Sequence, residues 1–205
     1  MKKLFPGLGK KAEPKKPIIV VSGLPRSGTS MMMKILSEGG LSVVTDEIRS
    51  ADDDNPNGYF ELEAVKQMSE GNVAWLGETD GKVVKVISAL LEHLPSQFSY
   101  KVIFMEREIK EVLASQRKML THRQEDSSVE DVEMEEQFKK HVSAVKAWLV
   151  RQPNIEVLYV SYNVMLGDSE ALCKKVIDFL GVSMNFERML AVPNERLYRN
   201  RKVSV

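Results

Sequence analysis

The sequence predicts a three-layer α/β/α fold with a mostly parallel central sheet. Short apolar runs typical of buried strands alternate with helical patterns along the chain, and the first run passes through a glycine-bounded loop into an apolar helix. With 205 residues and 43% hydrophobic content, the chain can build one domain with a substantial core. The runs interpreted as strands cover residues 18–22, 42–45, 83–86, 101–105 and 155–160.

The chain begins with a lysine-rich segment. Residues 1–16 combine lysines with proline and glycine and offer little to bury, which predicts a flexible basic arm. No internal repeat or second boundary follows, so residues 17–205 are expected to form a single domain.

Composition narrows the functional classes. The formal net charge is +0, which argues against broad electrostatic attachment to nucleic acid. Cys173 is the lone cysteine, so an intramolecular disulfide is impossible and a thiolate metal cluster is disfavoured; its setting predicts a buried helix face. Neither a secretion signal nor an apolar run of membrane-spanning length is recognisable, and we expect a cytoplasmic protein.

The loop after the first strand carries the strongest chemical signal. It matches the Gly-x-x-x-x-Gly-Lys-Ser/Thr phosphate loop at Gly23, Gly28 and Ser30, but Thr29 stands where the lysine should be and the cation is Arg26. The glycines permit unusual backbone angles, and the amides of residues 27–30 open a helix whose positive end favours an anion. Oxyanion binding is predicted.

The loop sequence Pro-Arg-Ser-Gly-Thr-Ser resembles the 5′-phosphosulfate loop of sulfotransferases that use 3′-phosphoadenosine 5′-phosphosulfate (PAPS). The resemblance extends over about residues 17–183 and implies the P-loop form of the α/β/α fold. It also implies that the 5′ end of the nucleotide is bound by Arg26, Ser27, Gly28, Thr29 and Ser30.

The loop after the second predicted strand carries Glu47. Its spacing from Arg26 resembles that in tyrosylprotein sulfotransferases, which implies that Glu47 is the catalytic base. The alternatives are that Glu47 pairs with Arg49 or caps a helix, and that Glu61 is the base. Residues 50–60 are acidic and turn-forming, and they predict either a mobile cover or a surface turn anchored by its aromatic residues.

The third predicted strand ends near Lys85. In the resembling segment a lysine acts on the bridging oxygen of the phosphosulfate, and a cation there would stabilise charge that develops as the sulfur–oxygen bond breaks. Cytosolic small-molecule sulfotransferases have a histidine base two residues later, but Ile87 occupies that position here. Either Glu47 replaces the histidine or the base is missing.

The fourth predicted strand leads into a segment resembling the family's 3′-phosphate site. Arg107 at the strand end and Ser115 on the following helix are the corresponding residues, and a guanidinium fork suits phosphate oxygens. The alternative makes Arg107 a partner of Glu106 or Glu108.

The last part of the chain adds a long helix, predicted over residues 129–150 from its apolar face and charge polarity, and the fifth strand. After that strand Tyr162 matches a tyrosine that can line the adenosine pocket, although it could equally be a packing residue; Asn163 replaces the family's usual glutamate. The basic tail at 197–202 lacks the Arg-Lys-Gly segment that closes the 3′-phosphate site in cytosolic sulfotransferases.

These observations predict a sulfotransferase that moves a sulfuryl group from PAPS to a hydroxyl or amine acceptor by in-line transfer, releasing 3′-phosphoadenosine 5′-phosphate (PAP) without a metal. Arg26, Glu47 and Lys85 are the expected catalytic residues. The acceptor is expected to be a small molecule, carbohydrate or peptide. The alternatives are a P-loop kinase or hydrolase, opposed by Thr29, and a non-catalytic nucleotide-binding protein, which Ile87 keeps open.

Overall fold

A four-stranded, all-parallel sheet forms the centre of the molecule in a computed structural model, which describes residues 15–46, 48, 52, 55, 58–122 and 131–193. The strand order is β2-β1-β3-β4, and the three neighbouring pairs run parallel. The carboxyl ends of the strands therefore share one edge of the sheet. The strands are β1 (Ile18–Gly23), β2 (Val83–Lys85), β3 (Tyr100–Glu106) and β4 (Ile155–Ser161).

The predicted strand at residues 42–45 is not formed as a full strand. Val43 makes a single parallel bridge to Val83, supported by hydrogen bonds from the Val83 amide to the Ser42 carbonyl and from the Val44 amide to the Val83 carbonyl. The ladder stops there because the next backbone amide, at Asp46, donates to the carbonyl of Glu61 instead. The prediction of a sheet segment here therefore holds only for this one bridge, and the extent of the pairing was overestimated.

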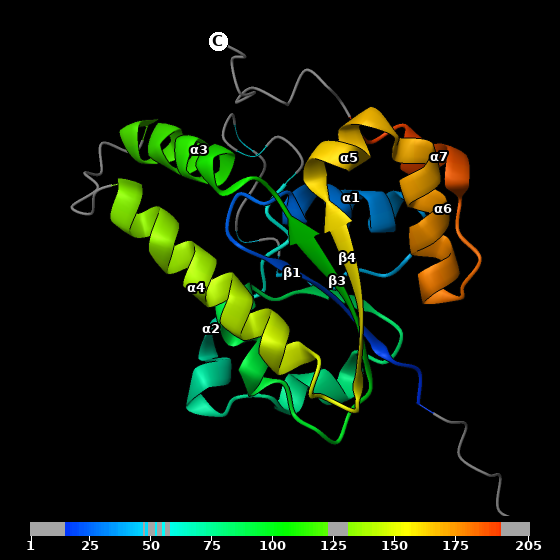
Figure 1. The fold of residues 1–205 in the computed structure, drawn as a ribbon. Coiled ribbons are helices and arrows are strands. Elements are labelled where there is room, and N and C mark those ends of the chain that lie inside the picture. The colour runs from blue at the N-terminus through cyan, green and yellow to red at the C-terminus, as the bar shows by residue number, and fades with distance from the viewer. Residues whose placement is uncertain are drawn as a thin grey trace, which may run out of the picture.

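Helical layers cover both faces of the sheet (Figure 1). Alternate residues of β1 show the division: Ile19 and Val21 pack with α1, α6 and α7, whereas Ile18 and Val20 pack with the side that holds α4 and the short 3-10 helices. Period-two alternation sends neighbouring side chains to opposite faces. The predicted three-layer arrangement is confirmed.

The helices largely follow the sequence pattern. The long helix predicted at 129–150 is α4, and its described turns begin at Asp131 and end at Leu149, with Leu149 buried under the sheet. Helix α3 starts just beyond the end of β3 and packs against α4. The helices are α1 (Thr29–Glu38), α2 (Glu63–Lys66), α3 (Ile109–His122), α4 (Asp131–Leu149), α5 (Tyr162–Gly167), α6 (Ser169–Leu180) and α7 (Phe186–Leu190), with 3-10 helices at Gln67–Glu70, Ala74–Glu78 and Ser88–His93.

Cys173 lies on the buried face of α6, as predicted. Burial raises the pKa of its thiol to about 11, so the thiol stays protonated near neutral pH. Within the described residues, no helix is both long and apolar enough to cross a membrane. The predicted arm at 1–16 lies almost entirely outside the described residues, and the tail at 197–202 lies wholly outside them.

Candidate active site

The loop between β1 and α1 packs so closely against its neighbours that a side chain at either of its two glycines would clash with other protein atoms. A Cβ on Gly23, whose φ is 146°, would lie 2.5 Å from the Ser27 hydroxyl and 2.6 Å from the Met105 carbonyl oxygen. A Cβ on Gly28, at φ 100°, would lie 2.3 Å from the ring of Tyr162. The loop is thereby pressed against β3 and α5 as well as shaped to admit a ligand.

The first turn of α1 offers donors that protein groups do not fully use. Gly28 precedes the helix without a side-chain cap, and no acidic residue lies in the first turn. The Ser27 hydroxyl is buried and has no hydrogen-bond partner among the described residues. A buried polar group of this kind calls for a partner, and an anion at the helix N-terminus would supply it.

Lys85 reaches this loop from the neighbouring strand, as predicted. Its Nζ donates to the backbone carbonyl of Tyr59 at 2.7 Å and to the Ser30 hydroxyl at 3.3 Å. The same hydroxyl accepts a hydrogen bond from the Asn55 amide at 2.8 Å. We call the set Ser30, Asn55, Tyr59 and Lys85 the Lys85 cluster.

Arg107 and Ser115 also converge on the loop, from its other side. The Nη1 of Arg107 donates to the backbone carbonyl of Arg26 at 3.2 Å, and the Nε of Arg26 donates to the Ser115 hydroxyl at 3.0 Å. Ser115 is buried on α3. The two residues taken from the 3′-phosphate segment are thus brought together, with Arg26 between them.

Glu111 is the counter-ion of Arg107, in place of the Glu106 or Glu108 considered from the sequence. The Arg107 Nε donates to Glu111 Oε2 at 3.1 Å, and both side chains are nearly buried, with 7% and 6% exposed. Glu106 instead pairs with Lys146 on α4. The missed signal was the four-residue spacing of Arg107 and Glu111 at the start of a helix.

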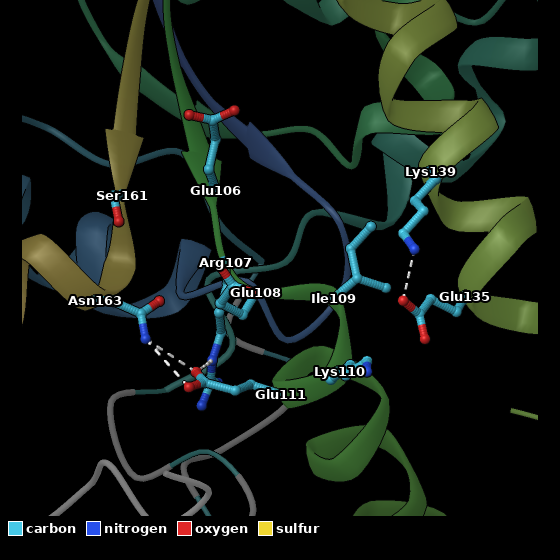
Figure 2. Close-up of a pocket in the computed structure, with 10 residues that line it drawn as sticks. All are labelled: Glu106, Arg107, Glu108, Ile109, Lys110, Glu111, Glu135, Lys139, Ser161 and Asn163. Carbon is cyan, nitrogen blue, oxygen red and sulfur yellow. Dashed lines mark hydrogen bonds and ion pairs between the residues drawn. The ribbon is translucent and has the colours of Figure 1, made fainter. Parts of the chain in front are cut away.

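Asn163 closes this arrangement from the opposite side. Its amide donates to both Glu111 oxygens at 3.2 and 3.1 Å, and Figure 2 shows Asn163 and Arg107 both pointing at the Glu111 carboxylate. An asparagine can donate here, whereas a second carboxylate would repel Glu111. We call the set Arg107, Glu111, Ser115, Tyr162 and Asn163 the Arg107 cluster.

Tyr162 lies beneath the guanidinium. The Arg107 carbon Cζ is 4.5 Å from the ring centroid, and the ring also covers Gly28. Burial raises the pKa of the phenol, and the nearby charge of Arg107 opposes that rise. Tyr162 packs against the loop and the guanidinium, and it keeps a polar end beside them.

A pocket of about 1010 Å³ opens beside the Arg107 cluster. Its floor includes Arg107, Glu111 and Asn163, and its far wall is formed by the Glu135–Lys139 pair of α4 (Figure 2). This volume is in the range of sites for small molecules and cofactors.

Glu47, the predicted base, lies outside the described residues, but the backbone on either side of it is held. Thr45 Oγ1 and the Asp46 amide both donate to the Glu61 carbonyl, at 2.9 and 3.2 Å. The Glu63 amide donates to the Asp46 carboxylate at 2.6 Å. These bonds form a closed neck at residues 45–46 and 61–63.

The hydrogen bonds around the neck also change the pKa of the Asp46 carboxylate. Hydrogen bonds from the Glu63 amide, and next from the Ile48 amide, lower the pKa of Asp46 below its ordinary value. Beyond the neck, Tyr59 is buried and its hydroxyl donates to Asp52 at 2.7 Å. The sequence supports two predictions for residues 50–60. The burial of Tyr59 supports the anchored turn. The mobile cover stays a prediction, because several residues of the segment lie outside the described residues.

The family follows from comparison with known proteins. A family model described as the sulfotransferase domain matches residues 16–204. The chain belongs to the sulfotransferase family. This confirms the predicted family and the enzyme class, sulfuryl transfer, over the kinase or hydrolase alternative. A comparison with curated protein sequences gave no significant match.

Solved structures agree on the fold of this sulfotransferase domain. Mouse SULT7A1, complexed with PAP, superposes with a TM-score of 0.54 at 18% identity over 93% of this chain and 66% of the mouse chain. The sulfotransferase domain of the Synechococcus PCC 7002 olefin synthase gives 0.51 at 14% identity, over 97% of this chain and 88% of that one. A sulfotransferase domain from the curacin biosynthetic pathway gives 0.50 at 15% identity, over 85% of this chain and 77% of that one.

Proposed function

We propose that this sulfotransferase uses PAPS as its donor and transfers the sulfuryl group to a hydroxyl or amine of a small-molecule, carbohydrate or peptide acceptor. The observation that carries the proposal is that Arg107 and Ser115, 81 and 89 residues from Arg26 in sequence, both hydrogen-bond to Arg26 in the anion-binding loop. Donors on both sides of one loop suit a nucleotide that carries phosphate groups at both its 3′ and 5′ ends.

The 5′ end of the donor would be held by the start of α1. The amides of residues 28–30 at the start of α1 would donate to an anion there, and the Ser27 hydroxyl lacks a partner among the described residues; the Ser27 amide itself donates to the Leu24 carbonyl at 3.1 Å. Thr29 and Ser30 add hydroxyl donors. When bound, PAPS supplies the activated sulfuryl group and the phosphate leaving group.

Lys85 would act on the departing oxygen. Its Nζ already hydrogen-bonds to Ser30, which places an ammonium charge at the first turn of α1. A positive charge at this point stabilises negative charge on the leaving phosphate more in the transition state than in the ground state.

Glu47 would accept the proton of the acceptor hydroxyl, with Glu61 as the alternative base. The neck holds the backbone on both sides of Glu47, and Glu61 itself belongs to the neck. Ile87, where a histidine base would stand in cytosolic small-molecule relatives, is 41% exposed and offers no proton acceptor.

Arg107 and Ser115 would hold the 3′-phosphate, and Tyr162 would line the adenosine pocket. Support comes from the burial of the Arg107–Glu111 pair, which fixes the guanidinium before a ligand arrives. We also propose that the reaction needs no metal and no nucleic acid and takes place in the cytoplasm. Glu106, which could have supported Mg²⁺ in a kinase, is paired with Lys146.

The deciding experiment combines binding with turnover. PAP is expected to raise the melting temperature more than ADP or ATP at equal concentration, because a ligand selective for the native state adds stability. Transfer of labelled sulfate from PAPS to a panel of phenols, alcohols, sugars, amines and tyrosine peptides, assayed with Mg²⁺ and again with EDTA, then tests catalysis.

The outcomes separate the alternatives. A larger, Mg²⁺-dependent shift with ATP would contradict the PAPS assignment. PAP binding without turnover on any acceptor in the panel would instead support a non-catalytic nucleotide-binding protein. Loss of turnover on adding EDTA, restored by Mg²⁺, would remove only the claim of metal independence.

A further inference from the structure

Arg26 was expected from the sequence to stabilise the sulfuryl group, but its side chain extends to the opposite side of the loop. Its Nε lies 3.0 Å from the Ser115 hydroxyl, which is on α3 and 89 residues away in sequence. Ser115 is itself buried, so this contact is built into the interior of the site.

The backbone of Arg26 also makes a contact on the Ser115 side of the loop. Arg26 has a φ of 70°, a left-handed conformation that non-glycine residues seldom adopt. In this conformation its carbonyl oxygen accepts a hydrogen bond from Arg107 Nη1 at 3.2 Å. The carbonyl oxygen and the Nε of Arg26 therefore contact Arg107 and Ser115 respectively, and strain of this kind typically persists at functional positions.

The cations are thus divided between the two ends of the loop. Lys85 contacts Ser30 at the start of α1, whereas the guanidinium groups of Arg26 and Arg107 lie on the Ser115 side. Two guanidinium groups and a hydroxyl form a donor set that suits a phosphate monoester dianion. Glu111 supplies a negative charge that stabilises this group of cations without a ligand.

We propose that Arg26 is a specificity-determining residue for the 3′-phosphate of the nucleotide and that the cation acting on the sulfuryl end is Lys85. This proposal rests on the proposed function. It makes Arg26 the source of the second positive charge at the 3′-phosphate site. In cytosolic sulfotransferases an Arg-Lys-Gly segment closes that site, and the basic tail at 197–202 does not contain this segment.

The test compares two nucleotides that differ only in the 3′-phosphate, PAP and AMP, by isothermal titration calorimetry. Arg26→Gly is the main variant because glycine adopts a φ of 70° without strain, so the fold is expected to be kept. We expect PAP affinity to fall by about tenfold to a hundredfold, the scale of a charge-assisted hydrogen bond, and AMP affinity to fall by less than about threefold.

Further variants make the result specific. Arg26→Asn, which also tolerates a left-handed backbone, should reproduce the loss, and Arg26→Lys should recover part of it by keeping the charge without the fork. Lys118→Ala removes an exposed cation from α3 outside the lining of the pocket and should leave both affinities unchanged. In Ser115→Ala combined with Arg26→Gly, the loss should be smaller than the product of the two single losses, because both residues contact each other and one phosphate.

Turnover adds an independent readout. Arg26→Gly should raise the KM for PAPS while kcat at saturating PAPS stays within about tenfold, since uniform binding is lost and transition-state stabilisation is kept. A hundredfold loss of kcat with unchanged PAP affinity would overturn the proposal and return Arg26 to the sulfuryl group.

Failure of this proposal differs from failure of the proposed function. If the wild-type protein prefers PAP to AMP and Arg26→Gly weakens both equally, only the role of Arg26 is overturned. If the wild-type protein shows no preference for PAP over AMP, the 3′-phosphate site and the Arg26 role are overturned together.

Discussion

The Lys85 cluster and the Arg107 cluster lie on two sides of one loop and are held in different ways. In the Arg107 cluster a buried ion pair joins Arg107 to Glu111 on α3, and Asn163 binds the same carboxylate from the start of α5. Glu111 and Ser115 on α3 and Tyr162 and Asn163 on α5 therefore have their positions fixed by helix backbones, and Arg107 follows directly after β3.

In the Lys85 cluster the ammonium group donates, among the described residues, to the Tyr59 carbonyl and the Ser30 hydroxyl, and half of the cluster comes from a loop. Lys85 donates to the Tyr59 carbonyl, and Asn55 donates to Ser30. Phe60, next to Tyr59, has a φ of 49°, so this loop also carries backbone strain. The contrast shows that the nucleotide side, the Arg107 cluster, is fixed by the scaffold before a ligand binds. The reacting side, the Lys85 cluster, depends instead on a loop.

The largest effect is expected at the base on the reacting side. Glu47→Gln should lower turnover by about two to four powers of ten while PAP affinity stays near the wild-type value, because a base acts on the acceptor proton alone. Single-turnover sulfuryl transfer and calorimetry measure the two quantities. Glu61→Gln is the matched control; full activity in Glu47→Gln with loss in Glu61→Gln would transfer the role.

Removal of the ammonium group at Lys85 should come next. Lys85→Ala is expected to reduce turnover by roughly a hundredfold or more, the scale of losing one electrostatic catalyst, with a smaller change in PAP affinity. Lys82→Ala, an exposed lysine just before β2, controls for the loss of charge. If PAP affinity fell as much as turnover, Lys85 would belong to nucleotide binding, and the division between the two clusters would be wrong.

In the Arg107 cluster the expected effect of a substitution is on the affinity for PAP. Arg107→Ala should weaken PAP by about tenfold to a hundredfold and weaken adenosine 5′-phosphosulfate, which lacks the 3′-phosphate, much less. Because the substitution also leaves Glu111 buried without its counter-ion, thermal melts without ligand must show that the protein is folded. Equal weakening of both nucleotides would exclude Arg107 from the 3′-phosphate site.

The smallest effect is expected at the neck. The pKa of Asp46 is lowered in the folded protein, so its hydrogen bonds stabilise the neck above the unfolded-state pKa, and that contribution is lost as the pH falls through the lower folded-state pKa. Asp46→Asn should therefore cause, at neutral pH, faster hydrogen exchange of the Glu63 and Ile48 amides. Unchanged exchange at both amides would show that Asp46 does not hold the neck.

The sequence predicted the layers well because strand alternation and burial are local properties. Residues of β1 alternate between the two faces, and the motif residues Arg107 and Ser115 have a fixed spacing around the start of a helix. The strand at 42–45 was overestimated because its pairing is ended by a hydrogen bond to Glu61, which no local pattern reveals.

Side-chain direction was the harder part of the site. The identity of Arg26 indicated an anion but not which side of the loop it serves, because that depends on a left-handed φ. The sequence indicates only that residues 50–60 favour turns, whereas the contact of Asn55 with Ser30 joins segments 25 residues apart. Asn163 departs from the family's usual glutamate, and its hydrogen bond to Glu111 joins two residues that no local pattern links.

The neck joins the two ends of the segment between Asp46 and Glu61. Hydrogen bonds from Thr45 and Asp46 hold these ends together, so their proximity does not depend on the residues of the segment itself. Loop-closure entropy rises only slowly with length, by about 0.6 kcal/mol for each doubling. Segments of different length can therefore be grafted between residues 46 and 61 to select new acceptors, provided that each graft keeps Glu47 and the contacts that Asn55 and Tyr59 make with Ser30 and Lys85.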